Sequence, residues 1–325
     1  MSNEKEVLIR LEDVKKYFEF KDGFTTQYVK AVDGVTLNIY RGETLGLVGE
    51  SGCGKSTLGR TILRLYDKAE GTVEFKGRNV WKQSSKEMLK LRRDMQIVFQ
   101  DPLASLNPRK TIYQIIEEPL CFHGYKNKEE RKVLVERIMQ AVGLDPAVGS
   151  RYPHEFSGGQ QQRVGIARAL ILRPEFIVCD EAVSALDVSV QAQILNLLHK
   201  LKNEYKLTYL FISHNLSVIK HVCDRIVVMY LGNVVEIASK EQLFSNPCHP
   251  YTRALISAIP IPDPDQKRQR IMLEGDIPSP AHPPEGCRFH PRCYECEGKE
   301  NCCTTRPKLV EVEPGHFVAC HQYCK

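Results

Sequence analysis

No stretch of the sequence reaches the roughly 18–20 consecutive apolar residues that a membrane-spanning helix needs. The best apolar run, from Ile226 to Val235, is too short and is interrupted by Gly232 and Asn233. The N-terminus also lacks the apolar core of a secretory signal peptide. We therefore expect the protein to stay in the cytosol and to act at a membrane only through a partner.

The sequence lacks a strong excess of one charge, internal repeats and low-complexity tracts. Its formal net charge is +5, and the charges are spread along the chain. Such a mild surplus is typical of a solvated surface, so we expect no nucleic acid partner. With 42% hydrophobic residues, the chain resembles a soluble globular protein. Its 325 residues suffice for one large domain with an appendage, or for two domains.

Cysteine is abundant rather than scarce, and its distribution is uneven. Of the 12 cysteines, seven lie between Cys287 and Cys324. The scattered ones are expected to pack as small buried hydrophobic residues. In a reducing compartment, the C-terminal group indicates a metal site rather than disulfides.

Short apolar runs without polar alternation are separated by helical patterns, which predicts an α/β fold with a mainly parallel sheet. The expected strands are residues 45–48, 95–99, 176–179, 209–212 and 226–229, and the clearest helices are residues 129–142 and 188–201. The segment from about 101 to 169 has few strand-like runs, so we expect an inserted helical subdomain there. Prolines crowd the region after residue 260, which predicts an irregular connector.

A phosphate-binding loop follows the first of these strands, where residues 49–56 fit the pattern G-x-x-x-x-G-K-[ST]. Glycines allow backbone N–H groups to surround phosphate oxygens at the start of a helix. Lys55 can reach the β- and γ-phosphates, and the Ser56 hydroxyl can bind Mg²⁺. The alternative is a glycine-rich turn without a ligand. The expected nucleotide-binding residues are Gly49, Ser51, Gly52, Cys53, Gly54, Lys55, Ser56 and Thr57.

Two carboxylates end the expected strand 176–179. Asp180 is suited to hold Mg²⁺ at the sheet edge. Glu181 is suited to accept a proton from an attacking water molecule. The alternative is that both acids cap the following helix.

A second candidate anion site lies at Ser157, Gly158, Gly159 and Gln160. Ser157 is a good N-cap, and the glycines expose the first N–H groups of the helix that follows. Read alone, this motif is also compatible with an ordinary helix cap.

With these motifs in this order, the sequence resembles the nucleotide-binding subunits of ABC transporters over about residues 7–258. The resemblance implies a P-loop NTPase core and two ATP molecules held between two such subunits, with residues 157–160 of one subunit closing over the ATP of the other. It implies that Gln100 senses Mg²⁺ and the attacking water, that residues 184–187 form the D-loop, and that His214 contacts the γ-phosphate. For the aromatic residue that stacks on adenine, we expect Phe18, with Tyr17 as the alternative.

Residues 100–109 and 249–255 further resemble the subgroup that serves oligopeptide and dipeptide importers, and its "F" member more than its "D" member. This implies an ATPase at the cytoplasmic face of the membrane, an unlike ATP-binding partner subunit, two membrane permeases and an extracellular or periplasmic binding protein. Nickel importers share the extension, so nickel or another small solute is the alternative substrate. A soluble ABC ATPase acting on ribosomes or DNA is the remaining rival. The expected domains are residues 1–258 and a Cys-rich extension, 259–325.

Residues 287–293 resemble the start of that subgroup's C-terminal motif. The resemblance implies a [4Fe–4S] cluster bound by Cys287, Cys293, Cys302 and Cys320. Four thiolates can equally hold tetrahedral Zn²⁺, which is the alternative. The other candidate ligands are Cys296, Cys303 and Cys324, and a set of free thiols without metal stays open. We expect the site to be structural, because the segment is too small to bury a core of its own.

Overall fold

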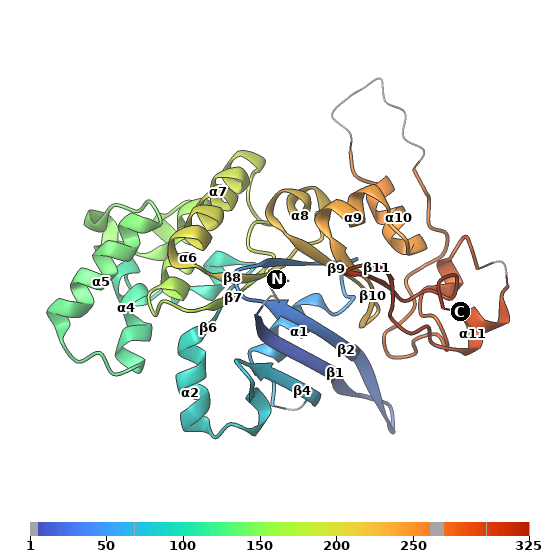
Figure 1. Cartoon of the computed structure of the whole chain (residues 1–325). Helices are drawn as coiled ribbons and strands as arrows, with labels where there is room; N and C mark the ends of the chain where they lie inside the picture. Colours follow the sequence, from blue (N-terminus) through green and yellow to red (C-terminus); the bar gives the residue numbers. More distant parts are fainter. Residues whose placement is uncertain (1–5, 68, 261–269, 297, 325) are drawn as a thin grey trace. The chain divides into compact units, whose positions relative to one another are not determined.

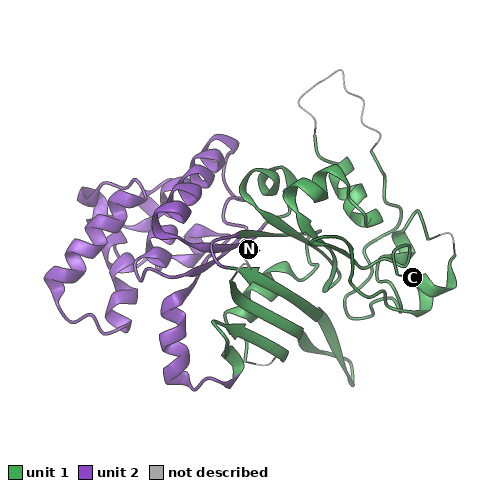
Figure 2. Ribbon diagram, viewed as in Figure 1, with its two compact units in different colours: residues 1–40, 44–81, 213–325 green, residues 41–43, 82–212 purple. Residues whose placement is uncertain are grey.

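The computed structural model describes residues 6–67, 69–260, 270–296 and 298–324. The chain forms two compact units (Figures 1 and 2). Unit 1 contains residues 1–40, 44–81 and 213–325, and unit 2 contains residues 41–43 and 82–212. None of the helices in the described ranges combines the length and apolar character that a bilayer-spanning segment needs.

An antiparallel sheet forms one layer of unit 1 (Figure 1). Its strands follow the order β2-β1-β4-β5. They are β1 (Val7–Asp22), β2 (Thr25–Tyr40), β4 (Glu70–Phe75) and β5 (Arg78–Asn79). Leu11, Val35 and Val73 are fully buried, so one face of this sheet contributes to the core.

A second set of strands in unit 1 carries the expected runs 45–48 and 226–229. β3 (Thr44–Val48) pairs in parallel with β9 (Arg225–Tyr230), which pairs antiparallel with β10 (Asn233–Ser239). Every residue of β3 is buried, as expected for a strand covered on both faces. The helices of this unit are α1 (Lys55–Ile62), α8 (Leu216–Val222), α9 (Lys240–Ser245), α10 (Pro250–Ser257) and α11 (Glu300–Thr304).

Unit 2 contains three parallel strands, in which β7 (Phe176–Asp180) pairs with both β6 (Met95–Val98) and β8 (Thr208–Ile212). β7 and β8 are buried throughout. Helix α6 packs against α3, α4 and α5. In Figure 1 the green helices α4 and α5 lie beside the yellow helix α6. The helices are α2 (Ser85–Asp94), α3 (Pro102–Ser105), α4 (Ile112–Phe122), α5 (Lys128–Ala141), α6 (Gly158–Leu170) and α7 (Val188–Tyr205).

The α/β architecture, the predicted strands and the two predicted helices are confirmed, and residues 101–169 contain helices and no strand. The expected boundary after residue 258 does not divide the two units, because all described residues beyond 212 belong to unit 1. One reason is a hairpin of β11 (Val310–Glu313) and β12 (His316–Val318), whose second strand pairs with β10. The described residues 270–289 form neither helix nor strand, while Pro262 and Pro264 of the expected connector lie outside the described residues.

Candidate nucleotide site and cysteine-rich segment

The phosphate-binding loop of unit 1 connects β3 to α1, and two of its glycines are required by close backbone contacts. Gly54 has a φ of 103° and N-caps α1. A Cβ at Gly54 would lie 1.9 Å from the carbonyl oxygen of Ala31, and a Cβ at Gly49 would lie 2.2 Å from that of Met229. Only glycine therefore allows the loop to turn with its N–H groups at the positive end of α1.

Lys55 begins α1 and is only 4% exposed. Its Nζ donates hydrogen bonds to the carbonyl oxygens of Gly49, at 2.8 Å, and Glu50, at 2.9 Å. The ammonium thus lies across the loop, where phosphate oxygens are expected. Burial raises the pKa of the Cys53 thiol, so this residue contributes its backbone and its packing. All the predicted phosphate-loop residues lie in this one segment: Gly49, Ser51, Gly52, Cys53, Gly54, Lys55, Ser56 and Thr57.

The candidate catalytic carboxylates lie in unit 2 at the end of β7. Asp180 is 1% exposed and is the last residue of the strand. Glu181 follows it with a φ of 48°, a left-handed conformation that is uncommon for a residue with a side chain. The Nε2 of Gln100 donates a hydrogen bond of 2.9 Å to Oε2 of Glu181. The structure therefore brings two of the three predicted catalytic residues into contact.

Ser157 caps helix α6, as predicted. Its Oγ accepts the N–H of Gln160, and the Gln160 side chain accepts the N–H of Ser157 over 3.0 Å. Ser157, Gly158 and Gln160 are exposed, so the positive end of this helix is open to solvent. A Cβ at Gly159 would lie 2.5 Å from Cγ1 of Val190, which explains a glycine there.

His214 is exposed in unit 1, in the loop before α8. The neighbouring Ser213 donates its backbone N–H to Leu47 of β3 over 3.2 Å. This contact ties the His214 loop to the strand that leads into the phosphate-binding loop.

The two aromatic candidates on β1 differ in their contacts. The Tyr17 hydroxyl donates a hydrogen bond to the carboxylate of Asp33. Phe18 packs edge to face against Tyr66 at 5.2 Å, and Nζ of Lys16 lies 4.9 Å from the Phe18 ring centroid. Tyr17 is therefore committed to a polar contact, whereas the half-buried Phe18 presents an aromatic ring beside a cation.

The predicted cluster ligands gather within the C-terminal segment. Burial, together with the nearby Cys320, Cys293 and Cys302, raises the pKa of Cys287 to about 12. A cavity of about 470 Å³ is lined by Cys293, Cys296, Cys302 and Cys320. Neighbouring thiols that oppose one another's ionisation suit a bound cation, because the cation stabilises the thiolates. Three of the four predicted ligands, Cys293, Cys302 and Cys320, therefore line one cavity together with Cys296, whereas Cys287 is not among the residues that line it.

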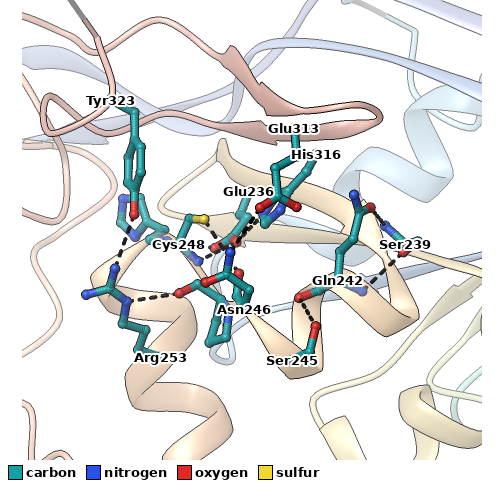
Figure 3. A network of polar contacts seen from close by, with 12 residues as sticks. Glu236, Ser239, Gln242, Ser245, Asn246, Cys248, Arg253, Glu313, His316 and Tyr323 are labelled. Carbon is teal, nitrogen blue, oxygen red and sulfur yellow. Dashed lines mark hydrogen bonds and ion pairs between the residues drawn. The ribbon is translucent and has the colours of Figure 1, made fainter.

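A polar network fastens the extension to the strands of unit 1 (Figure 3). The buried Glu236 accepts the backbone N–H groups of Cys248, at 2.8 Å, and His249, at 2.9 Å, and is bonded to Nε2 of His316 at 2.7 Å. Burial alone would raise the pKa of Glu236, but these hydrogen bonds lower it, so it stays a carboxylate. Removing His316 would leave that charge without its partner on β12.

Comparison with known proteins identifies the family. The model described as ABC transporter matches residues 32–184, and that of the oligopeptide/dipeptide transporter C-terminal region matches residues 235–302. The chain is 56% identical to YkfD, a putative oligopeptide transport ATP-binding protein of Bacillus subtilis (strain 168), over 97% of this chain and 95% of that protein. The chain belongs to the ABC transporter ATP-binding subunits. It is also 52% identical to the oligopeptide transport ATP-binding protein OppF of Escherichia coli (strain K12), over 97% and 96% of the two chains.

Solved structures of ABC cassettes share the fold. CbiO1 of Clostridium perfringens, part of the ABC transporter complex cbiONQ, has a TM-score of 0.64 and 26% identity over 74% of this chain and 92% of that one. The ATP-binding cassette MJ0796, solved as a dimer bound to ADP and Pi after hydrolysis, has a TM-score of 0.62 and 33% identity. The match covers 71% of this chain and 98% of that one. The ABC subunit described here is accordingly an ATP-binding and ATP-hydrolysing protein.

Glu50, the second residue of the phosphate-binding motif in this ABC subunit, has no role that the sequence motifs predict. The structure shows its backbone N–H donated to the hydroxyl of Tyr251 and its carboxylate paired with Arg292. Tyr251 and Arg292 lie in two of the segments that resemble the peptide-importer subgroup, residues 249–255 and 287–293. A carboxylate inside a phosphate-binding motif was the one available signal, because such a charge needs a cation nearby.

Proposed function

We propose that this ABC subunit energises the import of di- and oligopeptides from the cytoplasmic face of a membrane. One observation carries the proposal: an ABC cassette and a C-terminal region of the oligopeptide/dipeptide type occur on one chain. Full-length relatives named as oligopeptide transport ATP-binding proteins support the same substrate class. Nickel or another small solute is the alternative cargo.

ATP is held by the phosphate-binding loop, with Lys55 and the loop N–H groups on the phosphate oxygens and Phe18 against adenine. Ser56, Asp180 and Gln100 would hold Mg²⁺, since hydroxyl, carboxylate and amide oxygens are the ligands that this cation prefers. Bound there, the ion would neutralise negative charge on the phosphates. His214 contacts the γ-phosphate.

In hydrolysis, water attacks the γ-phosphorus and Glu181 accepts its proton as the new P–O bond forms. The bond from the γ-phosphorus to the β–γ bridging oxygen breaks, and its electron pair leaves with ADP. Lys55 and backbone N–H groups stabilise the charge that spreads over the phosphoryl oxygens. The hydrogen bond from Gln100 supports this role because it holds the Glu181 carboxylate in one direction.

The partners follow from the same assignment. Residues 157–160 form the exposed start of α6 and close over the ATP of a second, unlike ATP-binding subunit. Two permeases couple this closure to transport, and a binding protein outside the membrane delivers the peptide.

The cysteine-rich segment binds a [4Fe–4S] cluster through Cys287, Cys293, Cys302 and Cys320, with Zn²⁺ as the alternative. The thiol-lined cavity and the mutual influence of these cysteines support a bound cation. When bound, the group supplies a covalent cross-link for a segment with little core of its own.

Reconstitution with the permeases and the binding protein in vesicles tests the transport proposal. We expect ATP-dependent uptake of a radiolabelled tripeptide that excess unlabelled peptide abolishes and nickel does not. Uptake of ⁶³Ni instead would favour the metal importer. Failure to assemble with permeases, together with co-purification of ribosomal proteins, would favour a soluble ABC ATPase.

Anaerobic purification followed by absorption spectroscopy and metal analysis tests the cluster. We expect a brown protein that loses its iron in Cys293→Ser. Cys121→Ser is the control and should keep its iron, because Cys121 is exposed and lies far from the cysteine-rich segment in sequence. A colourless protein with one zinc per chain would show that the site binds Zn²⁺ and not an iron–sulfur cluster.

A further inference from the structure

The carboxylate of Glu50 forms a two-point ion pair with Arg292 of the C-terminal extension. Nη1 of Arg292 lies 2.9 Å from Oε2 and Nη2 lies 3.3 Å from Oε1. The side chains are 8% exposed for Arg292 and 25% exposed for Glu50, so solvent screens the pair only in part. Paired N–H donors also fix the direction in which the carboxylate points.

Arg292 is itself fixed in place by the extension. It ends a short 3₁₀-helix (His290–Arg292), and the next residue is Cys293. Its Nη1 also donates to the hydroxyl of Tyr230 over 3.4 Å, and the Tyr230 ring packs edge to face on Phe289 at 5.2 Å. The guanidinium is therefore bonded to Tyr230 of β9, and the Tyr230 ring is in turn packed on Phe289 of the cysteine-rich segment.

A residue of α10, just before the extension, holds the main chain at the same point. The hydroxyl of Tyr251 accepts the backbone N–H of Glu50 over 2.9 Å. Tyr251 is fully buried, and its ring centroid lies 4.8 Å from that of Tyr230. Tyr251 of α10 thus contacts the backbone of Glu50, and Arg292 of the extension contacts its side chain.

The charge of Glu50 gives this arrangement a consequence for nucleotide binding. Glu50 brings a negative charge into a loop that binds a polyphosphate, and Lys55 donates to its carbonyl oxygen. Arg292 is the cation paired with the carboxylate. Without Arg292 the carboxylate would repel the phosphates, and ATP more strongly than ADP because ATP carries more negative charge.

We propose that Arg292 is a positioning residue for ATP binding, which neutralises Glu50 and holds its carboxylate against the C-terminal extension. The extension thereby sets the nucleotide affinity of the cassette. The inference rests on the ATP site of the proposed function and not on the transported solute.

Equilibrium binding of ATP and ADP to the purified full-length chain tests the inference. Arg292→Ala should raise the Kd for ATP about tenfold, which corresponds to about 1.4 kcal/mol, and the Kd for ADP by less. Arg292→Lys should recover most of the affinity because it keeps the charge. The kcat at saturating ATP should stay close to that of the wild type.

Neutralising Glu50 distinguishes charge repulsion from loss of folding as the cause of a weaker affinity for ATP. Glu50→Gln in the Arg292→Ala background should restore much of the ATP affinity, which a general loss of folding would not allow. Arg253→Ala is the matched control, since Arg253 of α10 pairs with Glu295 of the extension at 2.7 Å and has no hydrogen bond to the loop among the described contacts. It should lower the melting temperature without changing the Kd for ATP.

Two results would overturn the inference: an unchanged Kd in Arg292→Ala, or an equal loss of affinity whether residue 50 is Glu or Gln. A wild-type chain that binds no ATP would instead refute the nucleotide site itself. A chain that binds ATP normally but imports no peptide would refute only the transport assignment.

Discussion

Gln100 and Glu181 are joined by a hydrogen bond of 2.9 Å, although they lie 81 positions apart in the chain. Glu181 also has the uncommon left-handed backbone conformation, at a φ of 48°. A strained residue whose side chain is oriented by a neighbour is a frequent arrangement at catalytic sites. The relationship yields separate predictions for the two residues.

Replacing Gln100 by Ala removes the group that orients Glu181 and leaves the carboxylate in place. We expect kcat for ATP hydrolysis to fall by up to about 100-fold, because small misplacements of a reacting group are costly. The Kd for ATP should change much less than kcat, since Lys55 and the loop N–H groups still hold the phosphates and Ser56 and Asp180 would still hold Mg²⁺. Steady-state turnover and equilibrium binding would show this split, and equal losses in both would contradict the orienting role.

Glu181→Gln keeps the size of the side chain and removes its basicity. Loss of a general base typically lowers the rate by about 10²–10⁴-fold, so hydrolysis should slow by that order while ATP still binds. Phosphate release and nucleotide binding measure the two effects. Glu204→Gln, on the exposed face of α7, serves as control and should hydrolyse ATP at the wild-type rate. Unchanged turnover in Glu181→Gln would remove Glu181 from the mechanism.

The two aromatic residues of β1 can be told apart by nucleotide affinity. Stacking on a base is worth about 1–3 kcal/mol, so Phe18→Ala should raise the Kd for ATP by about 5-fold to 150-fold. Tyr17→Phe removes only the hydroxyl that is bonded to Asp33. It should leave the Kd unchanged and lower the melting temperature. The reverse pattern in titrations with a fluorescent ATP analogue would assign adenine stacking to Tyr17.

His249 predicts a dependence of stability on pH. Burial lowers its pKa to about 4 from an ordinary 6.5, with Glu236 opposing and Arg253 adding to the shift. Between these values the unfolded chain binds a proton that the folded chain does not. Stability should therefore decrease as the pH falls from about 6.5 to 4, by up to about 3 kcal/mol.

His249→Asn isolates this contribution. Nδ1 of His249 accepts the N–H of Tyr251 at the start of α10, and an asparagine oxygen can take over that cap without titrating. Urea unfolding at several pH values should give a flatter profile for His249→Asn, while His282→Asn at an exposed histidine should keep the wild-type slope. Below about pH 4.5 both proteins should lose stability, because the lowered pKa of Glu236 acts there. An unchanged slope in His249→Asn would refute the assignment.

The parts of the site that could be predicted are those whose conformation is determined by residues close to them in sequence. A glycine-rich turn before Lys55 and a serine cap before Gly158 specify their conformations within a few residues. The buried strands β3 and β7 were likewise visible as apolar runs ending at the candidate ligands. These features need no knowledge of distant contacts.

What escaped prediction depends on partners far along the chain. Glu50 and Arg292 are 242 positions apart, and no local pattern pairs a loop carboxylate with one particular arginine. The difference between Tyr17 and Phe18 similarly depends on Asp33, which lies on the neighbouring strand β2. Such contacts arise from tertiary packing, so only the folded chain reveals them.

The hairpin of β11 and β12 also has a consequence for handling the protein. β12 covers the side of β10 opposite β9 through Glu236 and Ile237. A chain truncated before residue 310 would present the unpaired N–H and C=O groups of β10 to solvent, together with the buried charge of Glu236. Exposed strand edges of this kind recruit other chains. Shortened versions of the subunit should accordingly self-associate and precipitate at concentrations where the full-length protein stays dispersed.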